Sequence, residues 1–209
     1  MTARLPLVAV YADESCLGNG REGSNPGGAG GLIELMHRGA LVRRDFWLSE
    51  PATTNNRMAL RSAIEAMRVL SARRRRLRVV FVSDSRYLVD GNSKWIYEWI
   101  ERGWRRRTGA LENEELWREL AALRDGHLVE WRWVRGHAGN PQNEYANLLA
   151  TRAAAEQSAS GGAVPSRFDE WLSAERAKGR MTLDPFPPPE DEGFRPARSL
   201  PPPAPASLL

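Results

Sequence analysis

Two aspartates stand where apolar runs of the sequence end, and acids in such positions can hold a metal ion. Residues 8–12, Val-Ala-Val-Tyr-Ala, lead into Asp13, and residues 77–83 lead into Asp84. Apolar, β-branched runs of this length predict buried strands. If the two strands are neighbours in a sheet, their carboxylates repel each other unless one is protonated or a cation lies between them. Hard oxygen ligands of this kind select Mg²⁺, with Mn²⁺ as an alternative.

The alternative role for Asp13 is to cap a turn, because an aspartate at the end of a strand commonly caps the turn that follows. The loop after it, residues 17–31, is rich in glycine and asparagine. A third polar segment favours the metal site. Residues 137–140, His-Ala-Gly-Asn, form a loop that also follows a predicted strand, and we expect this loop to meet the two aspartates.

The elements that must position these residues alternate between period-two and helical patterns. Strands are predicted at residues 8–12, 27–35, 41–49, 77–84 and 128–134. Helices are predicted at residues 56–72, at 85–89 with a continuation at 93–101, at 113–124 and at 143–157. The short connections make the first three strands an antiparallel meander. The order is β-β-β-α-β-α-α-β-α, which predicts an α/β fold with a mixed five-stranded sheet flanked by helices.

The sequence divides into a domain and a C-terminal region of different composition. We expect the domain to occupy residues 1–156 and a linker residues 157–165. Residues 166–180 form a short amphipathic segment, in which Phe168, Trp171 and Leu172 predict a short helix that docks on another surface. The remaining residues, 181–209, are rich in proline, and we expect an extended or disordered tail.

Composition limits the class of protein and its partners. Apolar residues make up 42% of the 209 positions, but no apolar run approaches the roughly 20 residues that span a membrane. The first residues do not resemble a secretory signal. A single cysteine, Cys16, excludes an intramolecular disulfide and a cysteine-based zinc cluster, and we expect a cytoplasmic protein. Arginine clusters at 73–76 and 102–107, with a pI near 9.7, favour a polyanionic partner.

Five motifs in a fixed order carry a resemblance to a known family. They are Asp13-Glu-Ser-Cys-Leu-Gly-Asn19, Thr53-Thr-Asn-Asn-Arg-Met58, Ser83-Asp-Ser85, Trp95-Ile-Tyr-Glu-Trp-Ile-Glu-Arg-Gly-Trp104 and Gly136-His-Ala-Gly139 with Asn143-Glu144. Together they resemble type 1 ribonuclease H of bacteria over about residues 5–156. Each motif is weak by itself, but their order on the predicted strands and loops is specific.

The resemblance implies roles for particular residues. Asp13 and Asp84 fall on aspartates that bridge two Mg²⁺ ions around the scissile phosphate. His137 falls on a mobile histidine that assists leaving-group protonation or product exit. The implied contacts to an RNA/DNA hybrid are Asn19, Asn55, Asn56, Trp95, Trp99, Trp104, Arg105, Arg106 and Arg107. For Trp95 and Trp99, packing in the core is the alternative role.

The sequence departs from the family pattern at two of four metal-binding carboxylates. Ala59 stands where the family has a glutamate, and Asn147 stands where it has an aspartate. Asn147 still offers a neutral oxygen ligand, whereas Ala59 offers none. Glu14, which replaces the usual glycine after Asp13, is a candidate for compensation, as is Glu144 on the last helix. In a regular strand Glu14 would point to the opposite face from Asp13.

Three functions are compatible with these observations. The first is a ribonuclease H that cuts the RNA strand of hybrids, impaired or altered by Ala59 and Asn147, with Asp13, Asp84, His137, Asn147 and Glu14 as catalytic residues. The second is a catalytically inactive module that binds hybrid or RNA. The third is an adaptor that docks through residues 168–172 and the tail. The sequence favours the enzyme, acting as a monomer.

Overall fold

The chain forms one sheet with helices on both faces. The structure, a computed structural model, describes residues 4–18, 25–72 and 74–202. Its strands are β1 (Leu7–Cys16), β2 (Gly27–His37), β3 (Ala40–Glu50), β4 (Arg78–Ser83), β5 (Leu128–Trp133) and β6 (Val164–Pro165). Its helices are α1 (Asn55–Ser71), α2 (Arg86–Asp90), α3 (Ile96–Glu101), α4 (Glu114–Asp125), α5 (Pro141–Glu156) and α6 (Phe168–Ala177), with a π-helical turn η1 (Gly91–Trp95) between α2 and α3. None of the helices in these ranges has the length and apolar character needed to cross a membrane.

The strands are arranged in the order β5-β4-β1-β2-β3-β6. The first three form the expected antiparallel meander, and β4 and β5 run parallel to β1. The sheet is mixed, as predicted, but the expected number of five strands is wrong. Val164 and Pro165 pair with Asp45 and Arg44 as a sixth strand at the edge beside β3. A strand of two residues is too short to produce a period-two signal in the sequence.

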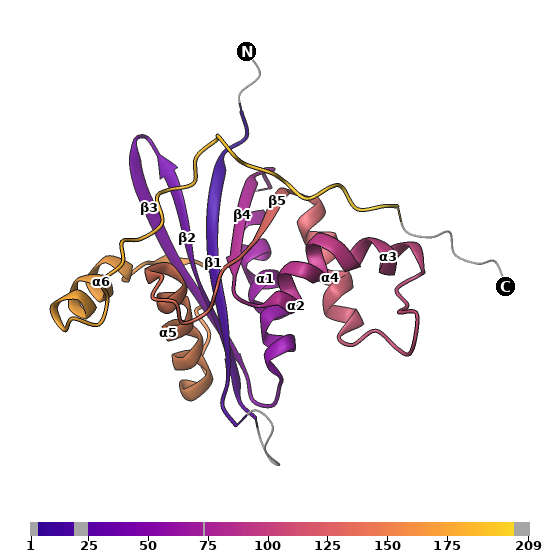
Figure 1. Cartoon of the computed structure of the whole chain (residues 1–209), viewed down its shortest axis with the longest axis horizontal. Helices are drawn as coiled ribbons and strands as arrows, with labels where there is room; N and C mark the ends of the chain where they lie inside the picture. Colours follow the sequence, from indigo (N-terminus) through magenta and orange to yellow (C-terminus); the bar gives the residue numbers. More distant parts are fainter. Residues whose placement is uncertain (1–3, 19–24, 73, 203–209) are drawn as a thin grey trace.

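Strand β1 is central, and its side chains alternate between two apolar layers. Val8, Val10 and Ala12 pack in the layer that contains α1 and α4. Ala9 and Tyr11 pack in the layer that contains α5 and α6. Figure 1 shows α1 to α4 on one side of the sheet and α5 and α6 on the other. This alternation continues into the acids at the end of the strand.

Small residues bring α5 very close to the sheet. A Cβ atom added at Gly28 would lie 2.1 Å from the Ala150 carbonyl oxygen, and one at Gly30 would lie 2.5 Å from the Leu149 Cβ. No side chain fits at such distances, so glycine is required at both positions. The close approach fixes α5, and with it the polar residues of its first turns, against β1 and β2.

The region after α5 packs against the domain, which corrects two expectations. Phe168 is fully buried and Leu172 is 8% exposed, in one apolar cluster with Tyr11 and Tyr145. The Phe168 ring makes an edge contact with Tyr145 at 5.4 Å between centroids. The predicted short helix is present as α6, but its apolar side chains are covered by the chain's own domain instead of a partner. The expected linker, residues 157–165, is not free either, because it pairs with β3.

The C-terminal strap, residues 178–202, is extended, which is one of the two states we expected, and it packs on the domain instead of being disordered. It crosses the face of the sheet from α6 towards α3, the yellow trace in Figure 1. The Phe186 backbone N–H donates to the Gln142 side chain at 3.0 Å, and the Ala197 N–H donates to the Val129 carbonyl at 2.8 Å. Proline excludes helix and central strand, but it does not prevent an extended segment from packing on a surface that the domain provides.

Candidate active site

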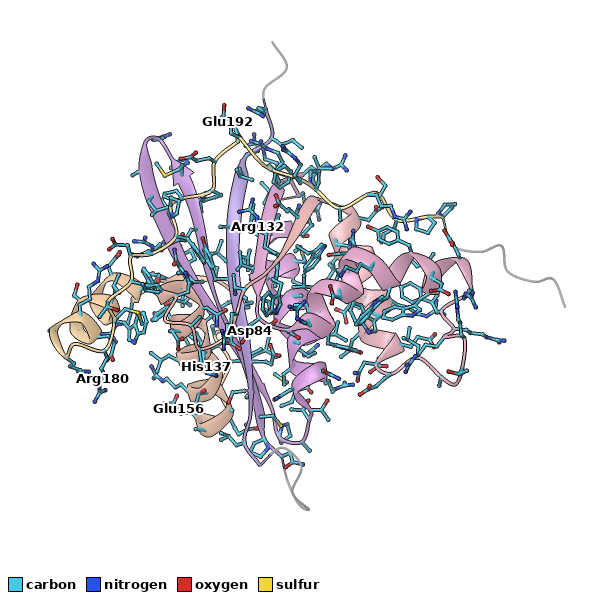
Figure 2. The ribbon with its side chains drawn as sticks, viewed as in Figure 1. Asp84, Arg132, His137, Glu156, Arg180 and Glu192 are labelled. Atoms are coloured by element: carbon cyan, nitrogen blue, oxygen red, sulfur yellow. The ribbon has the colours of Figure 1, made fainter. Side chains whose placement is uncertain are left out.

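Parallel pairing of β1 with β4 brings the acids together at one end of the sheet. Tyr11 pairs with Val82, so Asp13 and Asp84 each lie two residues beyond a matched pair. Carboxylate oxygens of Asp13, Glu14 and Asp84 lie within 4.8 Å of one another. The two aspartates meet as predicted from the sequence, and Glu14 joins them. Figure 2 shows Asp84 near the middle of the molecule with His137 close by.

Asp13 is held by two hydrogen bonds. Its Oδ1 accepts from the Glu14 backbone N–H at 2.7 Å, and its Oδ2 accepts from the Asn143 side-chain Nδ2 at 3.1 Å. Asp13 is 5% exposed and Asn143 is 4% exposed. The amide that contacts Asp13 therefore comes from Asn143, a residue to which the sequence analysis gave no role in the site.

Asp84 is held by the end of β5 and the loop that follows it. The Trp133 Nε1–H donates to the Asp84 backbone carbonyl at 2.9 Å. A Cβ atom added at Gly136 would lie 2.0 Å from the Asp84 Oδ2. Glycine is required at position 136 because the loop backbone passes directly against this carboxylate. The loop that carries His137 thus meets Asp84, as we expected from its place after a predicted strand.

Glu14 occupies the face of the sheet that α1 covers. β1 remains a regular strand as far as Cys16, so Glu14 shares its face with Ala12 and not with Asp13. Its partner on β2, Ala29, packs against Met58 of α1. Ala59 is fully buried in the same apolar layer as Ala12. The strand glutamate therefore lies on the side from which the family's helix glutamate would come.

One oxygen of Glu14 is suited to a ligand. The Oε2 atom is buried and has no hydrogen-bond partner among the residues that the structure describes. A buried carboxylate oxygen without a partner is costly, and a cation is one way to satisfy it. This orphaned oxygen, beside two further carboxylates, fits a divalent metal ion with oxygen ligands.

The acids of the site disfavour one another's ionisation. Burial, followed by the charge of Asp84, raises the pKa of Asp13 to about 7. Burial and then the charge of Asp13 raise the pKa of Glu14 well above its usual range. Burial also raises the pKa of Asp84. The negative charge of Glu144 acts in the same direction on both aspartates. A bound cation would reverse these shifts, and its binding would release protons.

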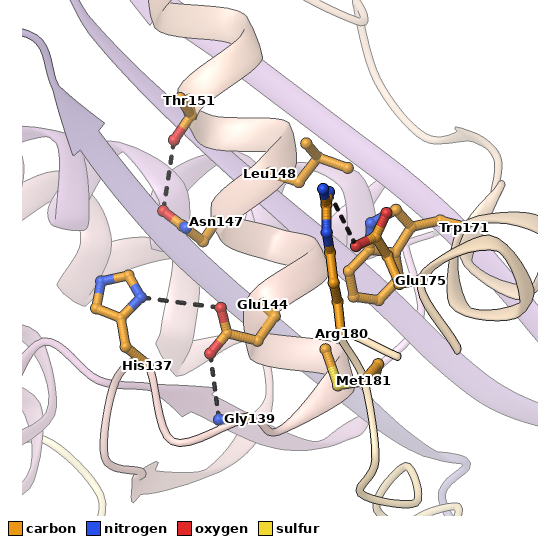
Figure 3. Close-up of a pocket in the computed structure, with 10 residues that line it drawn as sticks. All are labelled: His137, Gly139, Glu144, Asn147, Leu148, Thr151, Trp171, Glu175, Arg180 and Met181. Atoms are coloured by element: carbon orange, nitrogen blue, oxygen red, sulfur yellow. Dashed lines mark hydrogen bonds and ion pairs between the residues drawn. The ribbon is translucent and has the colours of Figure 1, made fainter. Parts of the chain in front are cut away.

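His137 and Asn147 line a cavity together with Glu144, as Figure 3 shows. The His137 backbone has a φ of 50°, and 78% of its side chain is exposed. Its Nδ1 lies 3.8 Å from the Glu144 Oε2, and the Glu144 Oε1 accepts from the Gly139 N–H at 3.3 Å. Asn147 is half-buried, and its Oδ1 accepts from the Thr151 hydroxyl at 3.5 Å. Asn147 thus faces the His137 cavity.

The predicted nucleic-acid contacts divide into exposed and buried residues. Asn55 is exposed and Asn56 half-buried at the start of α1, whose N-cap is Thr54, whereas Asn19 lies outside the described residues. Arg105, Arg106 and Arg107 are all exposed. These positions leave the described asparagines and arginines available to a substrate.

The tryptophans differ from one another. Trp95 is 39% exposed, and Trp99 is half-buried with its ring 5.1 Å from that of Trp117. Trp104 is 8% exposed, and the Arg118 guanidinium lies over its ring. Trp104 therefore packs mainly in the apolar core, and its contact with a nucleic acid stays a prediction.

Comparison with known proteins identifies the family. The ribonuclease H family model matches residues 6–155, which include the three clustered acids and His137. The chain belongs to the ribonuclease H family. A ribonuclease H from Stutzerimonas stutzeri is 42% identical over 146 residues, or 69% of this chain and 89% of the relative. A ribonuclease HI from Pseudomonas aeruginosa PAO1 is 41% identical over 150 residues, or 71% of this chain and 94% of the relative.

A solved structure extends the likeness to the C-terminal region. LC9-RNase H1, described as a type 1 RNase H with the type 2 active-site motif, is 57% identical, with a TM-score of 0.87 and 96% of each chain covered. The Stutzerimonas and Pseudomonas ribonucleases H match little more than two thirds of this chain, although nearly all of their own length is covered. The family match ends at residue 155, so α6 and the C-terminal strap lie beyond the shared ribonuclease H domain.

Sequence reasoning overlooked Asn143, although a signal for it exists. Asn143 begins a stripe of buried residues on α5 that continues with Ala146, Ala150 and Ala153. Spacing of three and four residues places them on one helical face, and the glycines of β2 bring that face against the sheet. A polar residue in such a stripe indicates a buried partner, which in this ribonuclease H is Asp13.

Proposed function

We propose that this chain hydrolyses the RNA strand of RNA/DNA hybrids with divalent metal ions held by Asp13, Glu14 and Asp84. The observation that carries the proposal is the convergence of these three carboxylates within 4.8 Å, with Glu14 on the face where Ala59 lacks a carboxylate. Mg²⁺ is the ion we expect, with Mn²⁺ as an alternative, because all the ligands are hard oxygens.

The charges of the site are consistent with two such ions. Asp13, Glu14 and Asp84, together with Glu144, offer four carboxylates, and two divalent cations carry four positive charges. The negative charge of Glu144 raises the pKa of both aspartates, so Glu144 contributes to the electrostatic potential of the site. In this proposal the loss of the two family acids is offset by Glu14 and Glu144, and Asn147 supplies at most a neutral oxygen.

The bound metal ions would activate a water and stabilise the oxygen that leaves the phosphate. The protein's own residues position the groups around them. Asn143 fixes one oxygen of Asp13, and the loop at Gly136 presses on Asp84. His137 stands at the rim with its ring exposed, where it can deliver a proton to the leaving oxygen, and Glu144 lies against its Nδ1.

Recognition of the hybrid rests on exposed polar and basic groups of the domain. Asn55 and Asn56 can hydrogen-bond the 2′-hydroxyls that distinguish RNA from DNA in the minor groove. Arg105 to Arg107, with Trp95, offer a basic surface for the phosphates of the DNA strand.

LC9-RNase H1 is itself described as a type 1 RNase H with the type 2 active-site motif. This description supports a functional site whose acids are arranged differently.

The second candidate function is an inactive hybrid-binding module, which Ala59 and Asn147 favour. A cleavage assay on an end-labelled hybrid in Mg²⁺ or Mn²⁺, run beside a binding assay, separates the two. The proposed function predicts internal cuts in the RNA strand that disappear in Asp84→Asn. Retained binding with no product at high enzyme concentration would instead identify the binding module.

A further inference from the structure

A cavity of about 590 Å³ joins the candidate active site to the C-terminal extension. One wall carries His137, Glu144 and Asn147, and the opposite wall carries Trp171 and Arg180 (Figure 3). The second wall lies beyond residue 155, where the match to the ribonuclease H family ends. A volume of this size is within the range of ligand-binding pockets. The extension therefore adds a second wall, which also carries Glu175, to the cavity that His137 lines.

The wall from the extension is held in place by packing. The Trp171 ring lies 5.1 Å from that of Tyr145 and 5.9 Å from that of Phe168. After α6, Gly179 adopts a φ of 68°, and the chain turns so that the Arg180 N–H donates to the Glu175 carbonyl at 3.0 Å. Met181, 8% exposed, anchors the next position. The Arg180 backbone is thus fixed on both sides.

Arg180 is the least engaged cation of this region. Arg176 pairs with Asp184 at 2.6 Å, and Lys178 pairs with Glu175 at 2.8 Å. The Arg180 guanidinium lies 3.9 Å from the same Glu175, and 71% of its side chain is exposed. A guanidinium at the mouth of a cavity can bind a phosphate through paired N–H donors. An aromatic ring on the same wall can pack against a sugar or base.

We propose that Arg180 and Trp171 form a subsite for one nucleotide of the RNA strand next to the scissile phosphate. Arg180 binds the backbone phosphate of this nucleotide, and Trp171 packs against its sugar or base. The RNA strand is the occupant because the cavity shares His137 with the reaction that the proposed function, on which this inference rests, assigns to that strand.

Salt-dependent binding of a hybrid tests the phosphate contact. Dissociation constants are measured from 50 to 200 mM salt in an Asp84→Asn background, in which no turnover is expected. Arg180→Ala should lower the slope of log Kd against log salt by about 0.9. The ratio of the Kd of Arg180→Ala to that of its parent should therefore fall about 3.5-fold from 50 to 200 mM salt. Arg180→Lys should keep most of the slope. The matched control is Arg167→Ala, which removes an exposed arginine of the same extension, paired with Glu170 at 2.9 Å.

Equal slopes for Arg180→Ala and its parent would overturn the subsite. An equal effect of Arg167→Ala would also overturn it, because the cause would then be net charge alone. Hybrids shortened stepwise from each end give a second readout. The Arg180 effect should vanish at one defined length on one side only, and an effect that is independent of length on both sides would contradict a single nucleotide.

Turnover separates this inference from the proposed function. In the active protein, Arg180→Ala should raise KM with little change in kcat, and unchanged thermal unfolding would show that the fold is intact. If the parent protein binds hybrid but never cleaves it, the proposed function fails while the salt slopes still test the subsite. If the parent cleaves and Arg180→Ala behaves like it at every salt concentration, the subsite alone fails.

Discussion

The two sides of the metal site differ in the elements that carry their acids. On the strand side, Asp13 and Glu14 lie near the end of β1 and Asp84 directly follows β4. The carboxylates of these three residues meet. On the helix side, the family positions for acids hold Ala59 on α1 and Asn147 on α5. Relative to the family pattern that the resemblance implies, one side has gained a carboxylate and the other has lost two. In this chain the site keeps its acidic character although the elements that supply the acids have changed.

The geometry of β1 makes this exchange feasible. Adjacent residues of a strand point to opposite faces, so Asp13 faces α5 and Glu14 faces α1. At the end of a sheet both faces border the same space, and two neighbours on one strand can reach a common site. A helix-borne glutamate and a strand-borne glutamate on the α1 face are therefore alternative solutions to the same requirement.

The largest effect should come from the strand side. Asp84→Asn should lower kcat/KM for hybrid cleavage about 10³-fold, because a charged ligand of the metal ions becomes neutral. Steady-state cleavage of a labelled hybrid at saturating Mg²⁺ measures it. Asp90→Asn on α2, an acid that pairs with Lys94 at 2.8 Å, is the matched control and should stay near the parent. Retained activity in Asp84→Asn would remove Asp84 from the site.

Glu14→Gln tests the exchange itself and should lower kcat/KM about 10²-fold. Adding Ala59→Glu to Glu14→Gln should then recover part of the loss, because the new carboxylate comes from α1 on the same face. The same assay, with urea unfolding to correct for the cost of a larger side chain at a buried position, measures both variants. An active Glu14→Gln protein would show that this glutamate does not compensate, whatever the double variant does.

The sequence was sufficient for the strand side and insufficient for the extension. Asp13 and Asp84 were predictable because two short apolar runs ended in acids, and neighbouring parallel strands then place them together. Glu14 could be named but not placed, because its meeting with Asp13 depends on how the end of the sheet is packed. Asn143 could be recognised as a buried polar residue from its stripe on α5, but its partner, Asp13, depends on the contact between α5 and β1. The packing of the C-terminal strap was not predicted, because a proline-rich composition does not reveal the surface on which it packs.

The crowding of acids should make the strand side sensitive to pH when metal is absent. The pKa of Asp13 rises from an ordinary value near 3.8 to about 7 in the folded protein, because of burial and the charge of Asp84. Between these values the folded protein binds more protons than the unfolded one, so the free energy of unfolding falls as pH rises from about 4 to 7. We expect a loss of a few kcal/mol across this range.

Urea unfolding in a chelator from pH 4.5 to 8 measures this effect. Because other groups titrate as well, the informative quantity is the difference between the parent and Asp13→Asn, in which the dependence should flatten. Mg²⁺ should restore stability most at the upper end of the range, where its ligands are ionised. If the unfolding free energy of the parent instead rose with pH as much as that of Asp13→Asn, the acids would not repel each other in the folded protein.

The smallest effect should come from restoring an acid on the helix side. Asn147 faces the cavity of His137 and Glu144, and its Oδ1 accepts from Thr151. Asn147→Asp should therefore raise kcat/KM by less than about tenfold and should act mainly by lowering the Mg²⁺ concentration at half-maximal rate. Thr151→Ala, which removes only the hydrogen bond, is the control. A gain of several hundredfold would mean that the helix side limits the reaction, and Glu14 would then be a poor substitute for the acids that the helices have lost.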